Sequence, residues 1–185
     1  MTESVAGLRG RVGMCCLIAA ESAMFTIFVV AYLFYVGKSV AGPNPEDVLH
    51  APVFLTVCLL SSSLTIHAGV KALEKGNVAG FARWWLLTLT LGAVFLAGTA
   101  VEWHRLIDVE GLTIQTNLFG TTYFSLVGLH AFHVTAGLVG LTLGSMLALL
   151  GYVTPSHASR GDVFSLYWHF VDGVWIVVFL VVYVL

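Results

Sequence analysis

The chain has 185 residues, of which 58% are hydrophobic and only 10% are charged. Soluble domains carry about 25% charged residues, so this composition predicts an integral membrane protein. The formal net charge is -2 and the chain has no dense patch of Lys and Arg, which excludes a nucleic acid as its partner.

Five apolar runs are each close to the roughly 20 residues that a transmembrane helix needs. We therefore predict an all-α integral membrane protein, a bundle of five transmembrane helices in one membrane domain over residues 1–185. The predicted spans cover residues 12–36, 52–70, 84–101, 119–150 and 163–185.

The first and fourth apolar runs are longer than a membrane span requires. The first contains Glu21 and exceeds the about 7 to 15 apolar residues of a signal peptide, so we expect it to remain as a helix. Residues 118–153 contain no Asp, Glu, Lys or Arg. At about 1.5 Å per residue they exceed a hydrocarbon core of about 30 Å, so the fourth helix should extend beyond the membrane. Residues 155–162 are expected to form a short polar connection to the fifth.

Basic residues are distributed unequally between the two ends of the predicted bundle. The end with Lys38 and Arg105 holds only these two basic residues. The end that includes the N-terminus holds six: Arg9, Arg11, Lys71, Lys75, Arg83 and Arg160. Cytoplasmic loops are enriched in Lys and Arg, so this bias predicts the N-terminus inside and the C-terminus outside.

Ionisable residues interrupt the apolar runs at similar depths. His169 and Asp172 are three residues apart and share one face of a helix. The imidazole, or polar groups on a neighbouring helix, could hold the buried carboxylate. By helical rise, His169 and Asp172 lie about 10 and 15 Å from the inner end of their span and Glu21 lies about 13 Å from the inner end of its own. His67 and His133 fall in the same half. The sequence therefore predicts a polar layer in the inner half of the bundle.

His130 and His133 share a helical face and could begin a metal or haem site. A bis-histidine haem needs one ligand from each of two facing helices, and a mononuclear metal needs a third or fourth strong ligand. The three cysteines form no C-x-x-C motif. We therefore predict no metal site and interpret these histidines as hydrogen-bonding groups between helices.

Glu21 has two interpretations. Placing a carboxylate in hydrocarbon costs on the order of 2.5 to 3.5 kcal/mol of free energy, so an acid at this position needs a function or a compensating partner. It could exchange protons, or it could be a protonated acid that donates one hydrogen bond to a neighbour. The residues around it do not decide between these two.

Aromatic residues lie near the ends of several runs, as in the interfacial belt of membrane proteins. We expect them to anchor the helices at the membrane surface. They are Trp84, Trp85, Trp103 and Tyr152. The chain has no nucleophile elbow, no phosphate-binding glycine loop and no H-E-x-x-H, so no soluble type of hydrolase or nucleotide enzyme is indicated.

Four segments together resemble subunit III of the haem-copper respiratory oxidases. Residues 167–175 read YWHFVDGVW, similar to the closing signature of that family, and residues 128–134 read GLHAFHV, similar to its Gly-x-His-x-x-His-Val helix. Residues 21–25 (ESAMF) resemble its Ser-Glu-x-x-Phe-Phe segment, with alanine before the acid, and residues 102–103 (EW) its Glu followed by an aromatic. The matches keep the family's order from about residue 13 onward.

The resemblance implies an all-α bundle beside the catalytic subunit I, with no haem or copper of its own, because the redox centres belong to partner subunits I and II. It implies bound phospholipid in a V-shaped cleft, with Glu21 facing that cleft and subunit I. It also implies support of proton uptake, resistance to turnover-linked inactivation and a place in the bacterial inner (plasma) membrane. The longer members have seven spans, so two helices that form one wall of the cleft are missing here.

The resemblance also distributes roles among the ionisable residues. Glu21 and His67, which falls where the family has a histidine near the inner end of its helix, are expected at the lipid cleft or in proton uptake. The expected inter-helix polar network consists of His130, His133, His169, Asp172 and Glu102.

Two other functions stay open. The accessory subunit of nitric oxide reductase has the same fold and the short five-span length. A free-standing membrane cytochrome that binds haem through His130, His133 and His169 is the alternative from another class. Co-purification with an oxygen-reducing oxidase or with a reductase would distinguish the oxidase subunit from the nitric oxide reductase subunit. A Soret band of the purified chain would identify the cytochrome.

Overall fold

The computed structural model describes residues 2–39 and 42–185. Five of the described helices are long and apolar enough to cross a membrane, and the described residues contain no strand, which confirms the predicted all-α membrane fold. The elements are α1 (Thr2–Tyr35), the short α2 (Pro45–Val48), α3 (Val53–Glu74), α4 (Val78–Asp108), α5 (Leu118–Leu149), the 3-10 turn η1 (Pro155–His157) and α6 (Ala158–Tyr183).

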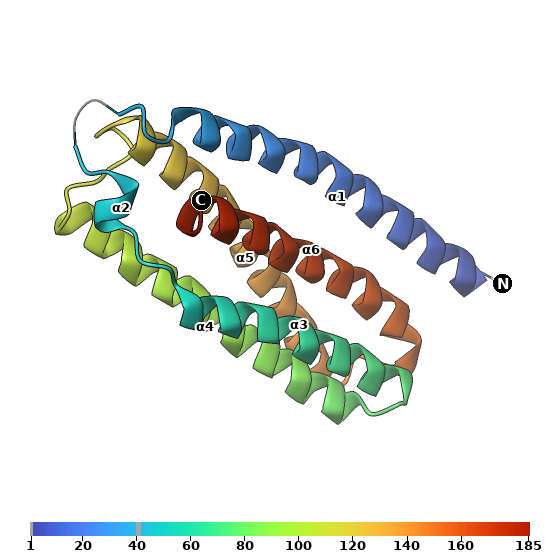
Figure 1. Ribbon diagram of the computed structural model, residues 1–185. Coiled ribbons are helices and arrows are strands. Elements are labelled where there is room, and N and C mark those ends of the chain that lie inside the picture. Colours follow the sequence, from blue (N-terminus) through green and yellow to red (C-terminus); the bar gives the residue numbers. More distant parts are fainter. Residues whose placement is uncertain (1, 40–41) are drawn as a thin grey trace.

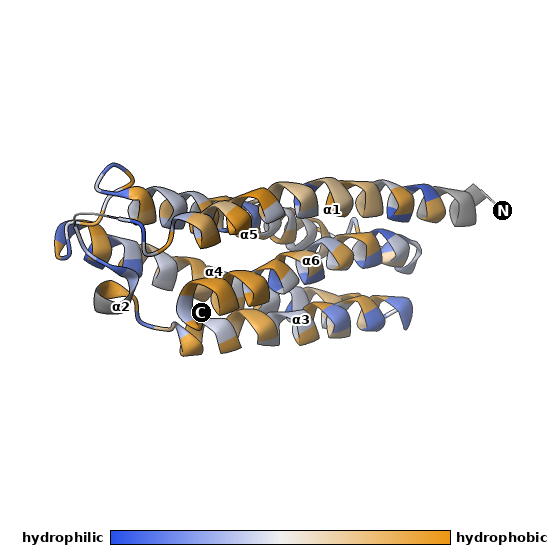
Figure 2. Ribbon diagram, turned by 45° about the horizontal axis from the view of Figure 1, so that its top comes forward, coloured by the Kyte–Doolittle hydropathy of each residue, from blue (hydrophilic) through white to orange (hydrophobic). Residues whose placement is uncertain are grey.

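The helices run side by side as a bundle (Figure 1). α3 and α4 form an antiparallel pair, α6 packs on α3, and α1 contacts α5 and α6 along the outside. Hydrophobic residues cover the middle of the helices and hydrophilic residues gather toward the ends (Figure 2). This distribution is the one that a bilayer requires, because backbone groups are satisfied within the helices and polar side chains reach water at the surfaces.

α4 extends well beyond the apolar run that predicts it, residues 84–101. It begins after Asn77, whose side chain accepts a hydrogen bond from the Gly80 N–H at 2.7 Å, and it continues through Glu102 and Arg105. Such a cap satisfies one of the free N–H groups of the first turn. Hydropathy detects the part of a helix that can lie in hydrocarbon, whereas capping and tertiary contacts set the ends of the helix.

Residues 155–162 are also more ordered than the predicted polar connection. Pro155–His157 form η1 and α6 begins at Ala158, so most of this polar connection is itself helical. Asp162 lies within α6 and makes an ion pair with Arg11 of α1. Polar residues at the membrane surface do not end a helix when solvent or a partner satisfies them.

The core is built around large aromatic residues that lie against glycines. Trp168 of α6 is fully buried, and a Cβ added at Gly137 of α5 or at Gly92 of α4 would overlap its ring or lie unusually close to it. Without a hydrophobic drive between helices in lipid, close approach at small residues is a main source of packing energy. Trp175, one more buried ring, packs edge-on against Phe95 at 4.7 Å between centroids.

The prediction that Trp85 belongs to the interfacial belt is wrong, because its side chain is buried in the bundle. Trp84 is 41% exposed, as the belt requires, but Trp85 is only 4% exposed and packs against Phe81 and Phe164 at 4.4 and 5.5 Å. Because α4 begins at Val78, Trp85 lies two turns into the helix and points to the bundle interior. The two neighbouring tryptophans therefore have opposite environments.

Candidate functional site

Glu21 of α1 faces His133 of α5. The Glu21 Oε2 atom lies 3.2 Å from His133 Nε2, and the side chains are 23% and 7% exposed. The other ring nitrogen of His133, Nδ1, donates a hydrogen bond to the Leu129 carbonyl at 2.8 Å. Tyr167 of α6 donates its hydroxyl to the His133 carbonyl at 3.0 Å, and Phe25 packs on the imidazole at 5.1 Å.

This geometry determines how the pair can share a proton. A carbonyl only accepts, so Nδ1 of His133 carries a hydrogen, and Nε2 of the neutral ring then has a lone pair. The contact with Glu21 therefore holds one proton, on the carboxyl oxygen or on Nε2. Both forms of the pair have a net charge of zero, which lowers the cost of an acid at this depth. The structure thus gives Glu21 the neighbour that one of its two interpretations required.

A second contact joins α6 to α3. Ser63 of α3 donates a hydrogen bond to Asp172 Oδ2, and its oxygen lies 2.9 Å from His169 Nδ1. Serine has one hydroxyl hydrogen, so with that hydrogen on Asp172 the imidazole of His169 is the donor to Ser63. His169 and Asp172 have no direct hydrogen bond in the described chain, and Ser63 connects them.

This set of Ser, His and Asp is not a nucleophilic triad. In a triad the serine gives its hydrogen to the histidine and the carboxylate holds the other face of that ring. Here Ser63 gives its hydrogen to Asp172 instead, so the hydroxyl is not activated as a nucleophile. Asp172 is buried, and the described residues offer no partner for its Oδ1 atom. The arrangement holds two helices together through hydrogen bonds.

Two further hydrogen bonds extend this contact along α3. The indole N–H of Trp168 donates to Ser62 Oγ at 2.8 Å, and the indole N–H of Trp175 donates to Thr56 Oγ1 at 3.1 Å. Three turns of α6 therefore contact hydroxyl groups of α3. The contact is polar at each step but contains no exposed charge.

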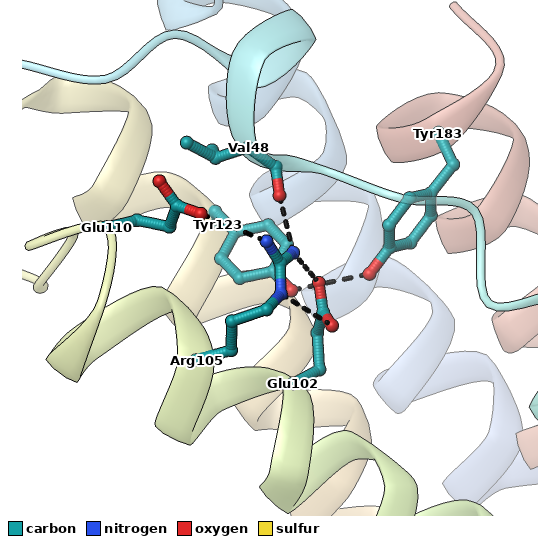
Figure 3. Close-up of polar contacts among 6 residues, drawn as sticks. All are labelled: Val48, Glu102, Arg105, Glu110, Tyr123 and Tyr183. Carbon is teal, nitrogen blue, oxygen red and sulfur yellow. Dashed lines mark hydrogen bonds and ion pairs between the residues drawn. The ribbon is translucent and has the colours of Figure 1, made fainter.

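Glu102 lies toward the opposite end of the bundle. It makes an ion pair with Arg105 on its own helix at 2.6 Å, and Arg105 also contacts Glu110 at 3.2 Å and donates to the Val48 carbonyl at 2.6 Å. Figure 3 shows Arg105 between these groups. Arg105 thereby ties α2 to the end of α4.

Two tyrosines lie beside this ion-pair cluster. The hydroxyls of Tyr123 from α5 and Tyr183 from α6 point toward each other and lie 3.3 Å apart (Figure 3). The end of α6 is therefore linked to α5 close to Arg105.

His130 and His67 differ from the other predicted site residues. His130 is buried, stacks on Trp175 at 5.0 Å and meets Phe95 edge-on at 5.8 Å, and neither ring nitrogen finds a hydrogen-bond partner in the described chain. His67 is exposed on α3, one turn from Ser63, and the part of the chain that the structure describes gives it no hydrogen bond. Residues 2–39 and 42–185 contain no group of three or more His, Cys, Asp or Glu that could hold a metal ion.

Two residues that organise these contacts, Ser63 and Arg105, are not marked as site residues by any sequence motif. Ser63 is one of three consecutive serines in an apolar run, a visible signal, but only the packing of α3 on α6 selects it as the partner of His169 and Asp172. Arg105 was visible only as a basic residue after Glu102. The hydrogen bond from Arg105 to Val48 of α2 depends on the conformation of the loop that contains α2.

Comparison with known proteins agrees with the motifs. Residues 3–185 match the family described as "Cytochrome c oxidase subunit III". "Cytochrome c oxidase subunit 3" of Corynebacterium diphtheriae is 43% identical over 129 residues, which are 70% of this chain and 62% of that protein. The protein of the same name from Synechocystis is 39% identical over 181 residues, 94% of this chain and 74% of the relative.

A third relative, "Probable cytochrome c oxidase subunit 3" of Mycobacterium leprae, is 36% identical over 155 residues, 82% of this chain and 76% of the relative. The five apolar helices and the bacterial relatives make this a multi-pass protein of a bacterial plasma membrane. The chain belongs to the cytochrome c oxidase subunit III family, whose members are non-catalytic subunits of haem-copper oxidase complexes.

Proposed function

We propose that this chain packs against the catalytic subunit I of its oxidase, stabilises it and supports proton uptake, with the contact between Glu21 and His133 as its proton-exchanging element. The observation that carries this proposal is the geometry of that pair. One proton is shared between a carboxyl and an imidazole, and the carboxyl is 23% exposed on an outer helix. An ionisable residue within a membrane span marks a proton pathway, and the exposed part of this carboxyl faces the surface that a partner subunit or lipid would cover.

The surface of α1 supports subunit I as the main partner. Among its described side chains only Phe25 and Tyr32 are buried, and the remaining surface is largely apolar. Ile27 and Phe34 are examples of its exposed large side chains. A helix attached along one narrow face leaves a broad surface for another subunit or for lipid.

Phospholipid is the second proposed partner. A hollow of about 310 Å³ lies between α1 and α6, and Ser22, the residue that follows Glu21, is part of its lining. A Cβ at Gly173 would meet nothing within 4 Å, so the absence of a side chain there widens the hollow. An acyl chain fits the apolar lining. The lining residues are Ser22, Phe25, Thr26, Val29, Phe170, Gly173, Val174, Val177 and Val178.

Haem and copper are proposed to reside in the partner subunits. The histidines that a free-standing cytochrome would use are engaged differently. Both ring nitrogens of His133 have partners, Nδ1 of His169 contacts Ser63, and His130 lies between aromatic rings. These contacts favour a structural use of the three imidazoles.

The orientation with the N-terminus inside is likewise proposed from the six basic residues at that end. It places Glu21 in the inner half of the membrane, on the side from which an oxidase takes up protons.

The proposal is tested by Glu21→Gln in the assembled oxidase. We expect the same yield of complex but slower proton uptake, faster inactivation during turnover or altered phospholipid content. Glu74→Gln is the matched control, because Glu74 is an exposed acid at the end of α3. Turnover, inactivation and lipid content that all equal those of the control would contradict a role of Glu21 beyond packing.

Affinity purification of the tagged chain from its native membrane tests the choice of complex. We expect subunits of an oxygen-reducing haem-copper oxidase to co-purify. Recovery of a nitric oxide reductase in their place would overturn the proposed partner.

A further inference from the structure

A hollow of about 380 Å³ lies at the end of the bundle where the chain begins, far along the helices from Arg105. It is formed where α3 ends, α4 begins, α5 ends and α6 begins, and these ends lie together in Figure 1. Sites for small molecules and cofactors typically measure about 300 to 1,000 Å³. The lining residues are Leu73, Phe81, Trp85, Gly140, Gly144, Leu147, Tyr152, Val153, His157, Arg160, Gly161 and Phe164.

The floor of this hollow is aromatic and rigid. Trp85 and Phe164 lie 5.5 Å apart and rest on the glycines of α5. A Cβ at Gly144 would overlap the ring of Trp85, and a Cβ at Gly140 would overlap the ring of Phe164. The two rings are therefore held against α5, and the space beside them is apolar.

The rim of the hollow carries positive charge. Arg160 is exposed and has no ion pair within the described chain, whereas Asp162 is already paired with Arg11. Nδ1 of His157 accepts the Thr154 backbone N–H at 3.1 Å, so the neutral ring carries its hydrogen on Nε2 and can donate a second hydrogen bond. Six of the eight basic residues of the chain lie at this end.

We propose that this hollow binds an anionic phospholipid, with an acyl chain on the floor formed by Trp85 and Phe164 and the phosphate beside Arg160 and His157. Basic pockets between transmembrane helices recognise anionic headgroups through this combination of cation and apolar floor. A zwitterionic lipid fills the same floor but neutralises Arg160 less well. The site lies on α3 to α6 and shares no lining residue with the hollow beside Glu21.

Native mass spectrometry of the full chain, titrated with dioleoyl-phosphatidylglycerol or dioleoyl-phosphatidylcholine, tests the proposal. We expect the first phosphatidylglycerol to bind about tenfold more tightly, because the choline cation of phosphatidylcholine offsets the attraction between its phosphate and Arg160. Arg160→Gln should reduce its affinity to that of phosphatidylcholine. Lys75→Gln removes a cation at the same end that does not line the hollow, and should leave the preference intact.

A second variant tests the floor without changing the charge. Leu147 is 48% exposed and lines the hollow, so Leu147→Trp fills space without disturbing the core, and it should weaken both lipids. Equal binding of the two lipids to the unaltered chain would overturn the proposal. So would an effect of Lys75→Gln as large as that of Arg160→Gln, or unchanged binding to Leu147→Trp, since either result would indicate lipid attracted only to the charged surface.

Discussion

The contact between α3 and α6 and the contact between α1 and α5 use similar polar residues in different surroundings. Asp172 and its partner Ser63 lie within the bundle, between tryptophans that add hydrogen bonds on either side. Glu21 meets His133 at the edge, where the carboxyl is partly exposed. The first contact stabilises the bundle, and the second attaches an outer helix through a group that remains accessible.

The physics of the bilayer explains the difference. Helices in lipid gain little from hydrophobic burial, so packing at small residues and hydrogen bonds between helices decide which pairs stay together. α6 has both, because Trp168 lies against glycines and donates to Ser62. α1 buries only Phe25 and Tyr32 among its described side chains, and should separate first.

The largest expected effect is that of Trp168→Ala. The indole is fully buried, and its removal leaves a cavity and takes away the hydrogen bond that Ser62 Oγ accepts, so we expect a loss of about 3 to 5 kcal/mol in the free energy of unfolding. Unfolding in mixed detergent and SDS micelles, followed by circular dichroism, measures it. Trp84→Ala is the control, with a change of about 0.5 kcal/mol or less because Trp84 is half exposed. Equal effects of the two variants would show that the α3–α6 contact is not dominant.

Asp172→Leu should follow, with a loss of about 1 to 3 kcal/mol, because the Ser63 hydroxyl loses its acceptor in a buried setting. Assembly with the other oxidase subunits should weaken accordingly. A double-mutant cycle with Ser63→Ala isolates the pair, and we expect a coupling of about 0.6 to 1.7 kcal/mol. A coupling of zero together with a normal yield of complex would argue against this contact as a structural joint.

Glu21→Leu should cost less, about 0.6 kcal/mol, because it removes one hydrogen bond at the edge of the bundle. Glu21→Gln should be neutral for stability, since the amide can donate to Nε2 of His133 as a protonated carboxyl does. The same unfolding assay compares the two variants. If Gln destabilised the chain as much as Leu, the charged form of the pair would be the one that stabilises α1.

Among the variants expected to destabilise the chain, Arg105→Gln should have the smallest global effect, about 0.3 to 0.5 kcal/mol, because partly exposed ion pairs contribute little. The local effect should be larger, since the Val48 carbonyl loses its donor. Amide hydrogen exchange of residues 46–49 should become faster, while that of α3 and α6 remains unchanged. His104→Ala, which removes only an exposed contact with Asp108, is the control. Unchanged exchange in Arg105→Gln would mean that other contacts hold α2.

Much of the fold could be predicted because a membrane helix has a local signature. About 20 apolar residues are enough to span hydrocarbon whatever their neighbours are, so the five spans follow from the sequence. Helix ends could not be predicted in the same way. Residues 158–162 and the first turn of α4 are helical through caps and contacts that hydropathy does not register.

In the candidate site, likewise, the residues could be predicted from the sequence but their contacts could not. Composition and motif order were sufficient for the five spans, the family and the choice of Glu21, His133, His169 and Asp172 as candidates, because a charged or ionisable residue in an apolar run is visible locally. Their partners depend on how the helices are rotated against one another. Packing of Trp168 and Trp85 on glycines accompanies these rotations, in which Ser63 faces Asp172 and His130 lies among aromatic rings. Side-chain direction across a bundle is a property of all the helices together, and no single run of residues contains it.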